Sequence, residues 1–120
     1  MLYLAQKFDK GGVDMSAIHL NKETFAQLLS GERPALVEFW APWCGHCRDL
    51  EGAFNQITED YKDRLAIGKI NIDDYPQLTQ QYYIEYVPTL VLFSEGSVVD
   101  FVISPGTKEA IAQFIEETLE

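Results

Sequence analysis

Residues 39–48 read Phe39-Trp40-Ala41-Pro42-Trp43-Cys44-Gly45-His46-Cys47-Arg48. They hold the only two cysteines of the chain, three positions apart, after an apolar run and at the start of a predicted helix. On a first helical turn, residues i and i+3 share a face with Cβ atoms about 5–6 Å apart, within reach of a disulfide after a small adjustment. A Cys-x-x-Cys pair in this setting indicates dithiol–disulfide exchange.

The two cysteines are predicted to have different roles. The first lies where unpaired backbone N–H groups and the helix dipole stabilise a thiolate, so we expect Cys44 to be the nucleophile and Cys47 the resolving thiol. Two inert buried thiols would not explain the placement beside Trp43. A zinc site needs four ligands, and only His19 and His46 could join the cysteines without carboxylates. Since His46 stands between the thiols, it is poorly placed for the same ion, and we expect no metal.

The bulk composition limits the class of protein. A chain of 120 residues with 47% apolar and 23% charged residues is typical of one globular domain. Its formal charge of −10 argues against nucleic acid as a partner, because phosphate binding needs clustered lysine and arginine. No apolar run approaches the length of a membrane-spanning helix, so no membrane partner is expected. A monomer is the default for this size.

Residues 1–15 are predicted to be a flexible N-terminal extension, tag or leader, joined through residues 10–14 to a domain over residues 16–120. The alternative is an ordered extension that packs Leu2, Tyr3 and Phe8. The first ten residues lack the features of a secretory signal, and both cysteines lie in one motif. A reducing, cytoplasmic compartment is therefore expected.

Hydrophobic periodicity predicts the order β-α-β-α-β-α-β-β-α. Residues 35–41 are nearly all apolar, as expected of a central strand buried on both faces. Other strands are predicted over residues 17–20, 65–72, 89–93 and 98–103. Helices are predicted from residue 22 to about 31, from the cysteine pair to about 61, over 75–82 and after 107. Strands that alternate with helices along the chain and end in a hairpin imply a mixed sheet with helices on both faces.

Residues 37–47, 69–73 and 87–93 together resemble the thioredoxin family. The resemblance spans residues 16–120 and implies the α/β thioredoxin fold, a central mixed sheet of about five strands flanked by about four helices. The length resembles a small bacterial-type thioredoxin. The dipeptide Gly45-His46 between the cysteines and Glu38 on the preceding strand instead resemble a protein disulfide isomerase domain.

The resemblance gives Glu38 a catalytic role. A carboxylate in an apolar strand is costly unless it is paired or protonated, and in this family a buried acid moves protons to and from the resolving cysteine. Burial would raise the pKa of Glu38 and suit it to that role. Lys69 matches the family's lysine near this acid and is its expected partner. The alternative is an outward-facing Glu38 near the sheet edge.

The resemblance also implies a substrate groove. Pro88 would follow a cis peptide bond, with the Val87 backbone pairing to an extended peptide; alternatively Pro88 simply opens a strand. Trp43, beside a cysteine that we expect to be exposed, would form an apolar rim rather than core. Tyr86 stands where bacterial thioredoxins often carry glycine, and Ser104-Pro105 replaces a usually small, glycine-containing stretch. Both positions are expected to border this groove.

His46 is predicted to tune the redox potential. When charged, it would stabilise the Cys44 thiolate and hence the reduced pair, which makes a stronger oxidant. We therefore expect a potential between those of thioredoxin, about −270 mV, and of protein disulfide isomerase, about −180 mV, or near the latter. The alternative is a solvated turn residue with no such effect.

The resemblance predicts a thiol–disulfide oxidoreductase that reduces protein disulfides. It needs no cofactor beyond the redox-active disulfide Cys44–Cys47, and a thioredoxin reductase supplied by NADPH is the expected reductant. One alternative is an oxidase or isomerase in oxidative protein folding, which His46 and Glu38 favour. Another is a scaffold that works independently of redox state.

Overall fold

In a computed structural model of the chain, residues 17–119 are described, and they form nine elements in the predicted order. The strands are β1 (Ile18–His19), β2 (Ala35–Trp40), β3 (Ala66–Asn71), β4 (Thr89–Ser94) and β5 (Ser97–Ile103). The helices are α2 (Lys22–Leu29), α3 (Gly45–Tyr61), α4 (Pro76–Gln81) and α5 (Lys108–Thr118). The predicted N-terminal extension lies outside the described residues.

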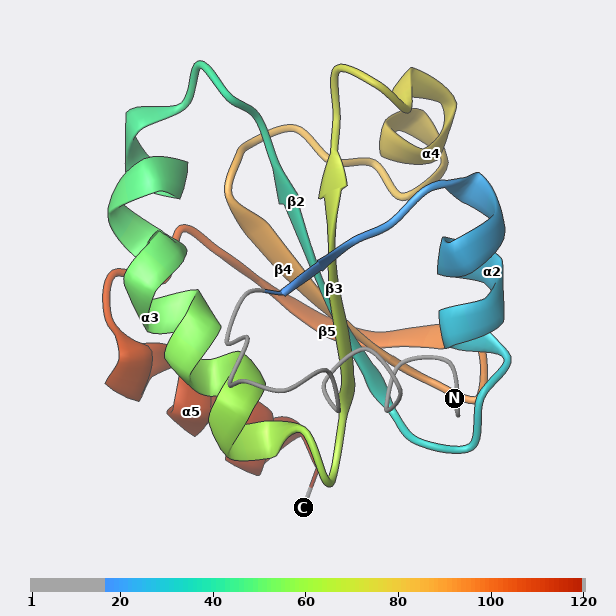
Figure 1. Cartoon of the computed structure of the whole chain (residues 1–120), viewed down its shortest axis with the longest axis vertical. Coiled ribbons are helices and arrows are strands. Elements are labelled where there is room, and N and C mark those ends of the chain that lie inside the picture. Colours follow the sequence, from blue (N-terminus) through green and yellow to red (C-terminus); the bar gives the residue numbers. More distant parts are fainter. Residues whose placement is uncertain (1–16, 120) are drawn as a thin grey trace, which may run out of the picture.

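The five strands form one mixed sheet in the order β1-β3-β2-β4-β5. The β1–β3 and β3–β2 pairs are parallel, whereas β2–β4 and β4–β5 are antiparallel. Figure 1 shows α3 and α5 on one side of the sheet and α2 and α4 on the other. This is the predicted α/β architecture, with β2 at the centre and β1 and β5 at the edges.

Side chains alternate between the two faces of each strand, so β2 supplies both halves of the core. Val37 and Phe39 pack with Phe25 of α2 and Leu78 of α4. Leu36, on the opposite face, packs with buried residues of α3 and α5. By the same alternation Glu38 faces α3, the helix that carries the cysteines.

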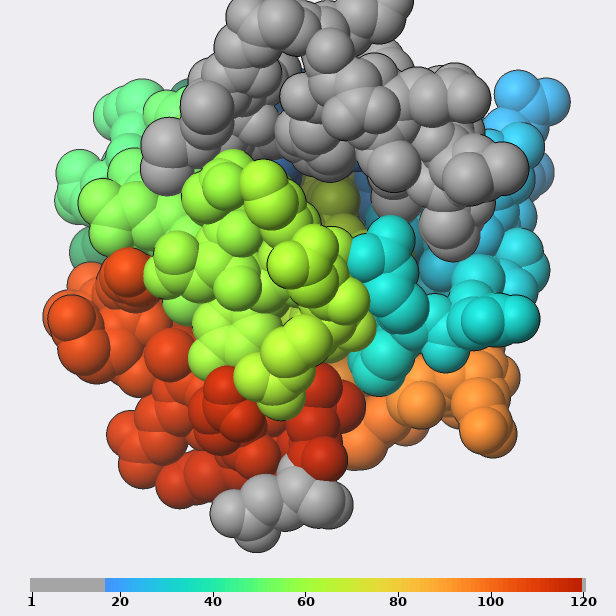
Figure 2. All heavy atoms as spheres, turned by 60° about the horizontal axis from the view of Figure 1, so that its bottom comes forward, coloured from blue at the N-terminus to red at the C-terminus, as the bar shows by residue number. Residues whose placement is uncertain are grey.

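Helix ends are capped where the sequence predicts. Asn21 and Thr24 form a capping box at α2, and the Thr107 hydroxyl accepts the Ala110 N–H at α5. Figure 2 shows the end of α3 against α5. Arg64, just after α3, pairs with Glu116 at 2.9 Å. Among residues 17–119, no helix is long and apolar enough to cross a membrane.

Gly68 should not tolerate a side chain. It lies on β3 between β1 and β2, and an added Cβ would meet Leu20 Cδ1 at 2.6 Å and the Ile18 carbonyl oxygen at 3.0 Å. We expect Gly68→Ala to lower the free energy of unfolding by about 1–3 kcal/mol through overpacking, measured by urea denaturation.

Gly52→Ala is the matched control. Nothing lies within 4 Å of its added Cβ in α3, so it should raise stability by about 0.5–1 kcal/mol. Equal effects at the two positions would contradict this.

Candidate active site

The cysteine pair lies at the N-terminus of α3. Cys44 is the N-cap residue, and its Sγ accepts the Cys47 backbone N–H at 3.1 Å. Both cysteines are free thiols. The sulfur of Cys44 therefore lies among the unpaired N–H groups of the first turn, at the positive end of the helix dipole. Cys44 thus lies at the start of the helix, the position that the sequence predicts.

The prediction that Cys44 is exposed is wrong. Only 6% of its surface is accessible, because Trp40, Ile72 and Val87 pack around the cysteine pair. The thiol donates a hydrogen bond to the Val87 carbonyl oxygen at 3.5 Å. A substrate disulfide therefore has only a small part of Cys44 accessible to it.

Cys47 is held as a protonated thiol. Burial raises its pKa to about 12, helped by its hydrogen bond with Cys44 and by the negative charges of Cys44 and Glu38. Glu38 is 1% exposed, and burial raises the pKa of its carboxyl to about 7, which the charge of Lys69 opposes in part. The expected burial of Glu38 is confirmed and the edge alternative is wrong. Its Oε1 has no hydrogen-bond partner among the described residues. A carboxyl that titrates near neutral pH thus lies close to a thiol that must lose a proton.

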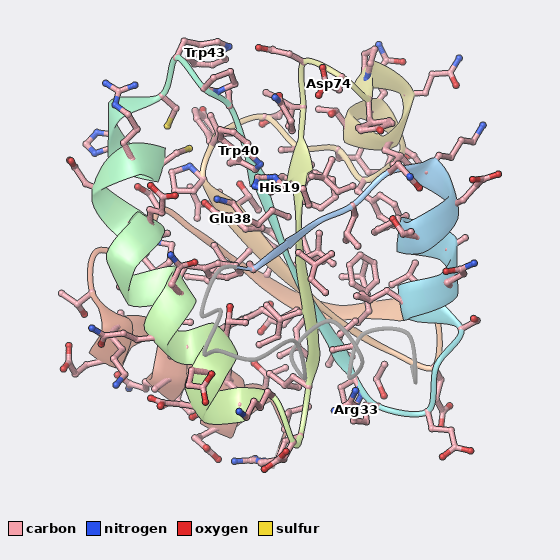
Figure 3. All side chains as sticks on the ribbon, in the orientation of Figure 1. His19, Arg33, Glu38, Trp40, Trp43 and Asp74 are labelled. Atoms are coloured by element: carbon pink, nitrogen blue, oxygen red, sulfur yellow. The ribbon has the colours of Figure 1, made fainter. Side chains whose placement is uncertain are left out.

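Lys69 is not a direct ion-pair partner of Glu38 among residues 17–119. The two residues are opposite each other on β2 and β3, but the Lys69 ammonium lies over the Trp40 ring, 4.7 Å from its centroid. His19 meets the same ring edge-on at 5.8 Å, and burial followed by the charge of Lys69 lowers the pKa of His19. Figure 3 shows Trp40, His19 and Glu38 together beneath Trp43. The Lys69 ammonium therefore acts on Glu38 electrostatically, without a direct contact. The Trp40 indole stabilises the ammonium by a cation–π interaction.

Trp43 forms part of the exposed surface beside the cysteines, as predicted. It is 65% exposed, and its Nε1 donates to the Asp73 carboxylate at 3.1 and 3.3 Å. The sequence reasoning missed Asp73. It follows β3, and Trp43 follows the neighbouring parallel strand β2, so both come from the same edge of the sheet. That topology was the signal that could have found the contact.

The Val87–Pro88 peptide bond is cis, as the resemblance implies. Pro88 is buried and its carbonyl oxygen accepts the Ser104 N–H at 2.7 Å. This bond brings Ser104 beside the cis bond, and Ser104 has φ +49°, a left-handed conformation that favours glycine. Tyr86 is 62% exposed and, with Trp43 and Val87, lines a cavity of about 270 Å³. We call this cavity the active-site groove.

His46 lies exposed on the first turn of α3, between the cysteines. Within residues 17–119, no cluster of three or more histidine, cysteine or acidic side chains is arranged to hold a metal ion. The structure thus brings Cys44, Cys47 and Glu38 together beneath the active-site groove, with His46 on the surface of the same helix.

Comparisons with known proteins agree with this geometry. The family model described as Thioredoxin matches residues 16–117. The chain is 37% identical over 105 residues to "Thioredoxin 1" of Nostoc sp., covering 87% of this chain and 98% of that protein. It is 35% identical over 101 residues to "Thioredoxin" of Alicyclobacillus acidocaldarius, covering 84% and 96%. It is also 37% identical to "Thioredoxin M-type, chloroplastic" of Chlamydomonas reinhardtii, covering 83% and 72%.

Proposed function

Because this chain belongs to the thioredoxin family and is a thiol–disulfide oxidoreductase, we propose that it reduces disulfides of protein substrates through Cys44 and Cys47. The observation that carries the proposal is the asymmetry of the pair. Cys44 is the N-cap of α3, whereas Cys47 is buried with its pKa raised to about 12. Cys44 is therefore placed to attack the substrate disulfide, whereas Cys47 stays protonated until the second step.

In the first step, the Cys44 thiolate attacks one sulfur of the substrate disulfide. A bond forms between Cys44 and that sulfur, and the other substrate sulfur leaves as a thiolate and takes up a proton. The Cys47 backbone N–H, which hydrogen-bonds Cys44 Sγ, supports the negative charge before the attack. The Val87 backbone beside Cys44 is proposed to pair with the substrate chain.

In the second step, Cys47 attacks Cys44 of the mixed disulfide. The Cys47 thiol must first lose its proton, and Glu38 is the proposed base because its pKa of about 7 leaves much of it ionised at neutral pH. The Cys44–Cys47 disulfide forms, and the second substrate sulfur leaves as a thiol. The substrate gains two electrons and the cysteine pair loses them.

The family implies protein substrates and a reductase that regenerates the dithiol. We propose a thioredoxin reductase supplied by NADPH as that partner, a cytoplasmic setting, and a monomer that needs no metal or organic cofactor. Lys69 is proposed to tune Glu38, and Trp43, Tyr86, Val87, Pro88 and Ser104 to contact substrate.

The test is the equilibrium constant of the cysteine pair against glutathione, read from tryptophan fluorescence, together with turnover of a protein disulfide by NADPH and a thioredoxin reductase. Reductase function requires turnover and a potential toward about −270 mV. A potential near about −180 mV, with oxidation or isomerisation of a reduced protein faster than reduction, would support the oxidase or isomerase alternative instead.

We expect His46→Pro to make the pair more reducing. His46 lies on the first turn of α3 between the two cysteines, so the substitution removes an imidazole that, when charged, favours the reduced form. The equilibrium constant with glutathione should shift about tenfold, which corresponds to about 30 mV for two electrons. His46→Gln is the control, because it removes the charge without proline's effect on the backbone. If the equilibrium constant with glutathione is unchanged in both variants, His46 does not tune the redox potential.

A further inference from the structure

A second cavity lies beside the active-site groove. It has a volume of about 490 Å³ and is lined by the segment after α4, by β4 and by β5. Val91 is buried and Tyr82 half-buried, and the exposed apolar members are Tyr83, Tyr86, Val98, Phe101 and Ile103. We call this cavity the β5 groove.

Within residues 17–119, Phe101 and Ile103 of the β5 groove belong to none of the hydrophobic core clusters. On β5, Val102 packs into the core on the α5 side, so Phe101 and Ile103 point to the opposite face. At an edge strand that face should be polar if it met only water. Instead Phe101 and Ile103 are 55% and 46% exposed and border a cavity.

Tyr83 is a further exposed aromatic side chain of the β5 groove. Its φ is +57°, a conformation that is unfavourable for a bulky residue and easier for asparagine or glycine. The turn directs the ring outward, with 87% of the residue exposed, while the adjacent Tyr82 packs in the core.

The two cavities adjoin each other and share part of their lining. Ile84, Glu85 and Tyr86 line both the active-site groove and the β5 groove. An extended chain that leaves Cys44 past Trp43 and Tyr86 would therefore reach the β5 groove along one apolar surface.

The segment that supplies the lining of both cavities, apart from Trp43, carries one sign of charge. Residues 70–107 contain no lysine or arginine and five acidic residues. They are Asp73, Asp74, Glu85, Glu95 and Asp100, and all five are exposed. None of them belongs to an ion pair within residues 17–119. An acidic rim disfavours a second copy of this face and favours a partner with positive charge.

We propose that the β5 groove is a second docking site for protein substrates, which holds an apolar or aromatic side chain flanked by lysine or arginine while the substrate disulfide lies at Cys44. The proposal rests on the proposed function and narrows its substrate class. The apolar anchor supplies buried area, and the flanking cations complement Glu85, which lines both cavities.

The test compares three disulfide peptides that share the same disulfide and spacer and differ in an appended segment. The segments are Lys-Phe-Lys, Glu-Phe-Glu and Ser-Ser-Ser, with several spacer lengths. For the full chain we expect kcat/KM for the Lys-Phe-Lys peptide to exceed that for Ser-Ser-Ser by about tenfold at low salt, through a lower KM. The advantage should be absent for Glu-Phe-Glu and should shrink as ionic strength rises.

The matched variants are Tyr83→Asn with Phe101→Thr, and Val99→Thr as the control. Asparagine suits the Tyr83 backbone and threonine suits a strand, so the double variant should fold. Val99 is on the same strand and 47% exposed but does not line the groove. The double variant should lose the Lys-Phe-Lys advantage and keep full activity on a small aromatic disulfide, while Val99→Thr changes neither.

Equal kcat/KM for all three peptides, or an advantage that survives in the double variant, would overturn the proposal. Other occupants have their own signatures. A concentration-dependent dimer abolished by the double variant would assign the groove to a second copy. A Phe8→Ser chain with a severalfold larger peptide advantage would assign it to the chain's own first residues. A chain that reduces neither peptides nor the small disulfide would instead refute the proposed function itself.

Discussion

Replacing Cys44 with serine should abolish disulfide reduction, lowering kcat/KM by a factor of about a thousand or more. A serine hydroxyl stays protonated at neutral pH, so the nucleophile is lost and Cys47 cannot replace it. Burial keeps Cys47 protonated by raising its pKa to about 12. Reduction of a protein disulfide with a saturating reductant, followed by the release of free thiols, measures the effect.

The matched variant is Cys47→Ser. It keeps the Cys44 nucleophile but removes the resolving thiol, so the mixed disulfide should accumulate and be visible as an added substrate mass on the intact protein. Serine is a good N-cap and at position 44 can accept the Cys47 N–H, so Cys44→Ser should stay folded. If Cys44→Ser retained activity, or if Cys47→Ser turned over without a trapped adduct, the assigned roles would be wrong. Full biological activity of a Cys44→Ser, Cys47→Ser protein would support the scaffold alternative.

Replacing Glu38 with glutamine should make the protein more stable above neutral pH. In the folded chain burial raises the pKa of Glu38 from 4.5 to about 7. Between those values the native state binds more protons than the unfolded state, so the free energy of unfolding falls as pH rises through this window. The free energy of unfolding falls by about 3 kcal/mol in total, because the two pKa values of Glu38 lie roughly two to three pH units apart. The variant should lack this loss, so its advantage should be near zero at pH 4 and largest above pH 8.

Urea denaturation across that range measures the stability effect. Glu32→Gln is the control, because it removes one negative charge from an exposed loop of the same acidic chain. A similar gain in both variants would assign the effect to general charge repulsion. A Glu38→Gln advantage that did not grow with pH would contradict the assigned titration.

The same variant should slow catalysis at the second step. Without a carboxylate to accept the Cys47 proton, resolution of the mixed disulfide should fall by about tenfold to a hundredfold, whereas the first attack by Cys44 is preserved. Rapid-quench analysis separates the two steps. Glu38→Ala should slow resolution of the mixed disulfide to a similar extent. A slower first attack in both variants would show that Glu38 acts on Cys44 instead.

The sequence alone determined the architecture because its signals are local. The apolar run over residues 35–41, the caps at Asn21 and Thr107, and Pro76 in the first turn of α4 each reflect hydrogen bonding or burial within a few residues. The cysteine spacing likewise depends on one helical turn. These features specified the element order and the redox pair without any long-range information.

Only the tertiary structure decided what surrounds the pair. Packing by Trp40, Ile72 and Val87 covers Cys44, which a local pattern at the helix start cannot reveal. The place of the Lys69 ammonium over Trp40 depends on β2 and β3 lying side by side. The β5 groove exists because residues after α4 meet β5 across β4, far apart in sequence. Burial and charge at a site sum contributions from all its neighbours in space, and the chain order does not state which neighbours those are.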